Sequence, residues 1–231
     1  MYTLHIGNKN YSSWSLRPWI LMRELGIAFG EQQHVFAGAV NWREFRAFSP
    51  TGRVPALVDG DTTVWDSLAI AEYLAERHAG VWPKDGRARA WARCVAAEMH
   101  SGFGNLRNIC GMSCGIRVRL FEIAPALQSE IARIDEIFGE GLERCGGPFL
   151  AGAVFTAADA FYAPVAFRVQ TYALPLSAPS AAYTRTLLNL AGMREWYAAG
   201  LAEPFRDPDH EAEVAAVGTI VQDLRAKAQG S

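Results

Sequence analysis

A tight hairpin signal close to residue 60 constrains the fold of this chain more than any other feature. The turn Asp59-Gly60-Asp61 separates two strand-like segments, residues 54–58 and 62–65. So short a connection joins antiparallel strands, because parallel strands need a crossover of roughly a dozen residues or more. The chain must therefore contain a sheet with at least one antiparallel pair.

The rest of the first 80 residues alternates strand and helix signals. Residues 2–6 alternate apolar and polar side chains, as a half-buried strand does. The order β-α-β-α-β-β-α predicts a mixed four-stranded sheet. The other expected elements are a helix over 16–25 that ends at Gly26, a strand at 34–36, a short helix at 42–48 and a helix from Asp66-Ser67 to Leu74.

The pattern changes after residues 81–86, which are rich in residues that break helices and strands. Beyond this segment we find only helical periodicity. We therefore expect an α+β domain over residues 1–80, a linker over 81–86 and an all-α domain over 87–231. The expected helices cover residues 88–111, 116 or 120 to 143, 156–172, 180–190, 193–201 and 211–228.

Composition excludes several classes of protein. A net charge of −2 over 231 residues argues against a nucleic-acid partner, because neutralising phosphates needs a strong basic excess. No uncharged stretch approaches the roughly 20 residues of a membrane span and no secretory signal is visible, so we expect a cytoplasmic protein. The four cysteines form no C-x-x-C pair and have no neighbouring histidine, so we expect buried, reduced thiols and no metal site.

The segment between the first strand and the first helix carries the candidate chemistry. It places three serines, Ser12, Ser13 and Ser15, at a helix N-terminus. Free N–H groups and the positive end of the helix dipole suit an anion or a thiolate at this position. The alternative interpretation is that these serines only cap the helix.

Four motifs in this order and spacing resemble the cytosolic glutathione transferase family. They are the serine turn, Arg53-Val-Pro-Ala-Leu57, Asp66-Ser67 and Thr156-Ala-Ala-Asp159. The turn Ser12-Ser13-Trp14-Ser15-Leu16-Arg17 is most similar to bacterial, serine-type members near the zeta and tau classes, although zeta has a cysteine where this chain has Trp14. The resemblance implies a thioredoxin-like first domain that binds glutathione as cosubstrate, a helical domain that forms the electrophile site, and a homodimer.

The resemblance also implies which residues hold glutathione. The bond between Val54 and Pro55 is expected to be cis, so that the backbone of Val54 pairs with the peptide like an added strand. Asp66 and Ser67 are expected to hold the charged γ-glutamyl end, and Arg53 is placed to reach the peptide or its glycine carboxylate. The alternatives are an edge-strand proline, an ordinary helix cap and a surface arginine.

Register with the zeta and tau motifs makes Ser12 the first candidate for the hydroxyl that stabilises the thiolate, before Ser13 and then Ser15. Tyr11 is the rival, because other branches of the family use a tyrosine. The electrophile site is expected between the domains, with Tyr11, Trp14, Phe103 and Arg107 as candidates and Arg168 and Tyr172 as further ones. Helix packing or a dimer interface is the alternative for the residues on the long helix.

The sequence therefore predicts an enzyme that adds the glutathione thiolate to a small hydrophobic electrophile, as in detoxification. A zeta-like cis-trans isomerase of the maleylacetoacetate type is the alternative, although no basic cluster for a dicarboxylate is visible in the sequence. A non-catalytic glutathione-binding protein is the third possibility, because a fold does not fix a function.

Overall fold

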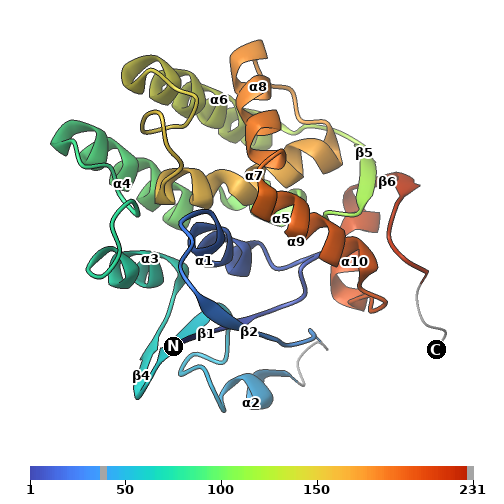
Figure 1. The fold of residues 1–231 in the computed structure, drawn as a ribbon. Coiled ribbons are helices and arrows are strands. Elements are labelled where there is room, and N and C mark those ends of the chain that lie inside the picture. The colour runs from blue at the N-terminus through green and yellow to red at the C-terminus, as the bar shows by residue number, and fades with distance from the viewer. Residues whose placement is uncertain (37–40, 228–231) are drawn as a thin grey trace.

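The computed structural model describes residues 1–36 and 41–227 and has a mixed sheet at one end of a larger helical body (Figure 1). The sheet has the strand order β2-β1-β3-β4, with α1 and α2 on opposite sides of it. The elements of this N-terminal domain are β1 (Tyr2–Ile6), α1 (Ser13–Glu24), β2 (Phe29–Gln33), α2 (Asn41–Phe45), β3 (Ala56–Asp59), β4 (Thr62–Val64) and α3 (Ser67–Ala75).

The pairing of the four strands confirms the predicted mixed sheet. β1 is parallel to β2 and antiparallel to β3, and the hairpin joins β3 to β4. The predicted second strand at 34–36 is wrong, because β2 ends one residue before it. β2 contains glycine, glutamate and glutamine, which have weak strand propensity, and pairing with all five residues of β1 outweighs that propensity.

The second domain is mainly helical, as predicted. Its expected long first helix is interrupted at Phe103, whose backbone is left-handed with a φ of 58°. Phe103 and Arg107 therefore lie outside the helix that covers residues 86–101. The elements are α4 (Gly86–Ser101), α5 (Gly104–Ile109), β5 (Ile116–Leu120), α6 (Pro125–Cys145), α7 (Ala157–Tyr172), α8 (Ala178–Leu188), α9 (Ala191–Ala202), α10 (Pro208–Val217) and β6 (Gly218–Asp223).

Two segments that we expected to be helical form a small sheet instead. β5 and β6 pair antiparallel, so the helix predicted from residue 116 begins only at Pro125. The helix predicted over 211–228 ends at Val217 instead. Residue 228, the last residue of that prediction, lies outside the described part of the chain. The alternation of β5, Ile-Arg-Val-Arg-Leu, is a period-2 strand signal, whereas β6 becomes a strand only by pairing with it.

The cysteines match the prediction only in part. Cys110 and Cys114 are buried, whereas Cys94 is exposed and Cys145 is half-buried, so the expectation that all four lie in the core is wrong. None of them forms a disulfide with another described residue. In the part of the chain that the structure describes, no helix is long and apolar enough to cross a membrane.

Two helices connect the domains and fix their positions. α1 packs against β1 on one side and against α7 on the other (Figure 1). α7 is buried along nearly its whole length and begins with a capping box in which Thr156 and Asp159 bond each other's backbone. Asp159 is fully buried and also accepts from the Leu150 N–H and the Tyr183 hydroxyl, each at 2.9 Å.

We expect Asp159→Ala to lower the free energy of unfolding by about 3–5 kcal/mol, because several buried donors lose their acceptor at about 1–3 kcal/mol each. The matched control is Asp85→Ala, which removes the exposed N-cap of α4 and should cost about 1 kcal/mol. Urea unfolding followed by circular dichroism measures both variants. Equal losses would show that Asp159 acts only as a cap.

Candidate functional site

The serine turn is held in place by the helical domain. Asn10 lies two residues before Ser12, and its carbonyl accepts from the Cys114 N–H at 3.2 Å. The Trp196 indole donates to the Lys9 carbonyl at 2.7 Å. The start of α1 is therefore positioned by contacts with residues more than 100 positions away in the chain.

The three serines have different surroundings. Ser12 Oγ donates to Ser15 Oγ at 2.7 Å, and Ser15 Oγ also accepts from the Gly7 N–H at 3.1 Å. Ser15 is fully buried and does not line the cavity described below. Ser15 therefore organises the turn, and the donor hydrogen of Ser12 is already used within it.

Ser13, the first residue of α1, contacts a buried cation from the other domain. Nη2 of Arg168, on α7, donates to Ser13 Oγ at 3.3 Å, and its Nε donates to the Cys110 carbonyl at 2.8 Å. Burial lowers the pKa of Arg168 to about 10, so the guanidinium is still charged at neutral pH. Because a guanidinium can only donate, Ser13 Oγ accepts here and its own hydrogen can be given to an anion.

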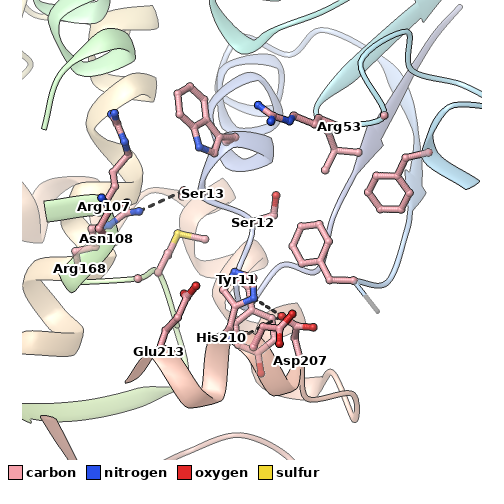
Figure 2. A pocket seen from close by; sticks show the side chains of 18 residues that line it. Tyr11, Ser12, Ser13, Arg53, Arg107, Asn108, Arg168, Asp207, His210 and Glu213 are labelled. Atoms are coloured by element: carbon pink, nitrogen blue, oxygen red, sulfur yellow. Dashed lines mark hydrogen bonds and ion pairs between the residues drawn. The ribbon is translucent and has the colours of Figure 1, made fainter. Parts of the chain in front are cut away.

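These side chains open into a cavity of about 640 Å³ between the two domains. In the view of Figure 2, Arg107 and Arg168 lie on the left, Arg53 at the upper right, and His210 with Asp207 at the bottom. Of the residues proposed from sequence, eight line the cavity: Tyr11, Ser12, Ser13, Trp14, Arg53, Val54, Arg107 and Arg168. The remaining lining residues are Phe36, Phe45, Gly52, Asn108, Gly111, Met112, Asp207, Asp209, His210 and Glu213.

The other residues proposed from sequence lie outside this lining. Phe103 is buried in the core, and Tyr172 donates its hydroxyl to the Gly111 carbonyl at 2.8 Å. The bond between Val54 and Pro55 is cis, as expected, and Pro55 is buried next to a cavity-lining Val54.

Asp66 and Ser67 belong to a second polar group. Asp66 caps α3 through the Leu68 N–H and lies 3.2 Å from Nε2 of His100. Ser67 is fully buried, and its hydroxyl is 3.5 Å from Nη1 of Arg17. Each of these residues therefore has a basic neighbour from another helix.

Trp14 connects this group to the cavity. Its ring lies 4.1 Å from the Arg17 guanidinium and 5.5 Å from that of Arg107, and it contacts the edge of His100. Arg17 is almost completely buried, so its pKa falls to about 9, and its Nε has no partner among the described residues. Two cations thus flank the tryptophan that replaces the zeta-class cysteine.

One wall of the cavity comes from α10, which the segment after β6 holds in place. The Tyr11 hydroxyl donates to Glu211 at 2.8 Å, and Arg225 bonds the same carboxylate at 2.6 Å. Burial and the neighbouring Glu211 raise the pKa of Tyr11, so its phenol stays protonated. Sequence reasoning missed this wall because its residues lie about 200 positions from the serine turn, and no local motif marks them.

The arrangement of the described residues suits an anion rather than a metal ion. Among them, no group of three or more His, Cys, Asp or Glu side chains could hold a metal. A hydroxyl, a helix N-terminus and a buried guanidinium instead meet at Ser13, and these groups stabilise negative charge.

Comparison with known proteins identifies the family. The family model for the glutathione S-transferase N-terminal domain matches residues 11–77. The model for the glutathione S-transferase C-terminal domain matches residues 116–199. The chain belongs to the glutathione S-transferase family. Curated relatives include the dichloromethane dehalogenase of Methylorubrum extorquens, 45% identical over 65 residues, which are 26% of this chain and 23% of that protein.

Other similar proteins match more of the chain. The maleylacetoacetate isomerase of Rattus norvegicus is 27% identical over 74% of this chain and 77% of its own length. A solved glutathione transferase homolog from Burkholderia, with bound glutathione, has the same fold, with a TM-score of 0.66. It is 22% identical and is matched over 86% of this chain and 97% of its own. The chain spans less than a quarter of the dehalogenase and about three quarters of the isomerase.

We expect Arg225→Gln to loosen the α10 wall, because the side chain of Arg225 is only 2% exposed and holds Glu211 by two ionic contacts. Loss of a charged hydrogen bond worth about 1.5–3 kcal/mol should reduce hydrogen-exchange protection of α10 by about tenfold or more. The control is Arg133→Gln, in an exposed pair with Glu98 that is worth at most about 1 kcal/mol. Unchanged exchange in α10 would contradict this role for Arg225.

Proposed function

We propose that the protein is a glutathione transferase that binds glutathione, stabilises its thiolate with a serine hydroxyl and adds it to a small hydrophobic electrophile. The observation that carries this proposal is the position and hydrogen bonding of Ser13. Its hydroxyl lines the cavity at the N-terminus of α1 and accepts a hydrogen bond from the buried guanidinium of Arg168.

The local interactions are strong enough for this task. A thiol pKa of about 8.5 leaves only a few per cent of the nucleophilic thiolate near neutral pH, and lowering it by ~2 units requires about 2.7 kcal/mol. One charge-assisted hydrogen bond supplies about 1.5–3 kcal/mol, and a helix N-terminus adds roughly 0.3–1 kcal/mol. A hydroxyl at the start of α1 is therefore sufficient without a general base for the thiol.

Alignment with the zeta and tau motifs ranks Ser12 first. The hydrogen-bonding pattern of the structure instead favours Ser13. Ser12 would have to break its bond to Ser15 before it could donate to a sulfur. Ser13 already accepts from Arg168 and keeps its hydrogen free, and the nearby positive charge makes that hydrogen a better donor.

The rest of glutathione can be placed on the cavity and on the second polar group beside it. We place the cysteinyl backbone beside Val54, with Arg53 near the glycine end, since both line the cavity. We place the γ-glutamyl group at Asp66 and Ser67, where Arg17 supplies a buried positive charge for its carboxylate. The solved Burkholderia homolog of the same fold contains bound glutathione, which supports glutathione as the ligand.

The electrophile then occupies the side of the cavity toward the helical domain. Trp14, Phe36 and Met112 supply apolar and aromatic surface, and Arg107 supplies a cation at its edge. We also propose that the protein is cytoplasmic, forms a homodimer and acts in detoxification, as the family resemblance implies.

Conjugation of a generic aromatic halide tests the assignment of the serine. Ser13→Ala should lower kcat/KM by roughly 10–100-fold, which corresponds to the loss of a charged hydrogen bond of about 1.5–3 kcal/mol. Ser12→Ala is the matched variant and should change kcat/KM by less than about fivefold, because its bond to Ser15 is neutral and worth about 1 kcal/mol.

Ultraviolet absorbance of the bound thiolate shows whether the loss of kcat/KM is caused by a rise in the pKa of the glutathione thiol. The reverse ranking of the two variants would return the role to Ser12. Wild-type protein that binds immobilised glutathione but gives no turnover with any electrophile would favour the non-catalytic alternative.

A second candidate function is glutathione-dependent cis-trans isomerisation of a maleylacetoacetate-type substrate. The observation that favours it is that Arg107 and Arg168 line one cavity, a pairing of cations suited to carboxylates that the sequence did not reveal. Similarity to the rat maleylacetoacetate isomerase supports it.

If this second reading holds, wild-type protein should isomerise maleylacetone in the presence of glutathione. Arg107→Leu should then reduce kcat/KM by about tenfold or more through the loss of a charged contact worth about 1.5–3 kcal/mol. Arg119→Leu, at an exposed position of β5, serves as the control. Absence of isomerisation by the wild-type protein would remove this candidate.

A further inference from the structure

The cavity contains an acid–histidine pair that thiolate formation does not use. Asp207 caps α10, and one of its carboxylate oxygens, Oδ2, bonds Nδ1 of His210 three residues later. Asp207 is only 3% exposed, and its other oxygen, Oδ1, is buried without a hydrogen-bond partner in the described structure. Both residues line the same cavity as Ser13.

The imidazole of His210 is fixed in orientation by two aromatic rings. It lies 4.8 Å from the ring of Tyr11 and stacks on Phe36 at 5.7 Å with an interplanar angle of 12°. Both rings come from the N-terminal domain, whereas His210 is on α10, so His210 packs against the opposite domain; Figure 2 shows it beside Tyr11. A helix cap alone requires neither these ring contacts nor a histidine.

The hydrogen bond to Asp207 also fixes which nitrogen can react. A carboxylate only accepts, so Nδ1 carries the hydrogen and Nε2 presents a lone pair. An imidazole held by a carboxylate in this way is the arrangement that catalytic sites use to take up and return a proton. No hydrogen bond or ion pair involving Nε2 is found among the described residues.

We propose that His210 transfers a proton to activated alkenes, such as α,β-unsaturated ketones, when glutathione adds to them, and that Asp207 positions it. This inference rests on the proposed transferase function and extends it to a class of electrophile. Aromatic halides release a halide ion and need no proton on carbon. Addition to an alkene, in contrast, leaves a carbanion-like carbon that must be protonated.

The proposed step balances in atoms and charge. The glutathione thiol releases its proton to solvent on binding, and His210 Nε2 takes up a proton from solvent. The thiolate sulfur then forms a bond to the β-carbon, and the π electrons of the double bond move toward the carbonyl group. His210 returns the proton to the α-carbon, so the product contains all atoms of both substrates and the imidazole ends neutral.

The test compares kcat/KM of the same preparation for an aromatic halide and for an α,β-unsaturated ketone such as trans-4-phenyl-3-buten-2-one. His210→Phe keeps a ring between Tyr11 and Phe36 but removes the proton carrier. The ketone-to-halide ratio of kcat/KM should fall by about 100-fold, the lower range for general acid–base catalysis. The solvent deuterium isotope effect on ketone addition should also disappear.

Two further variants make the test independent of folding damage. Asp207→Asn keeps an N-cap residue but removes the charge that positions the imidazole, and it should lower the same ratio by about tenfold, below the general acid–base range. His78→Phe is the matched control, because His78 bonds the Tyr2 hydroxyl and does not line the cavity. Its ratio should equal that of the wild type.

The outcomes separate this inference from the function on which it rests. An unchanged ratio in His210→Phe, including one that results from an equal fall for both substrates, would overturn the proton-transfer role and leave the proposed transferase function standing. Halide turnover with no ketone addition by the wild type would also overturn it. Absence of turnover with both substrates would refute the transferase and this inference together.

Discussion

The contact between Arg168 and Ser13 is the interaction on which the site depends. It joins α7 to the first residue of α1, and the 3.3 Å bond passes from one domain to the other. The acceptors of Arg168 are neutral: the Cys110 and Pro164 carbonyls and the Ser13 hydroxyl. A buried guanidinium held only by neutral groups is costly, and that cost is reduced when an anion binds beside it. This cost is the physical basis of the thiolate site proposed at Ser13.

The same argument applies to Arg17, a second buried arginine next to Trp14. It is buried against the Ser67 hydroxyl and the Met99 carbonyl, and no carboxylate of the described residues is among its hydrogen-bond partners. Burial lowers the pKa of both Arg17 and Arg168, so a bound anion would restore each toward its ordinary value. A ligand with a thiolate and a separate carboxylate, such as glutathione, matches these two cations.

Local signals allowed much of the fold to be predicted. The Asp59-Gly60-Asp61 turn required an antiparallel pair, and the capping box at Thr156 marked the start of α7, because both depend on neighbouring residues. β2 and β6 could not be predicted, because their sequences become strands only by pairing with β1 and β5. The α10 wall was missed for the same reason, since Glu211 meets Tyr11 across 200 residues.

The serine turn shows most clearly which features the local sequence determines and which the tertiary structure determines. The sequence by itself determined that three serines lie at the start of a helix that follows a strand, because strand, turn and helix signals are all local. Only the tertiary structure decided that they differ. Ser15 is buried, Ser12 is bonded to it, and Ser13 faces Arg168 from a helix about 150 residues later. A side chain's free hydrogen depends on which distant groups surround it, and packing alone brings those groups together.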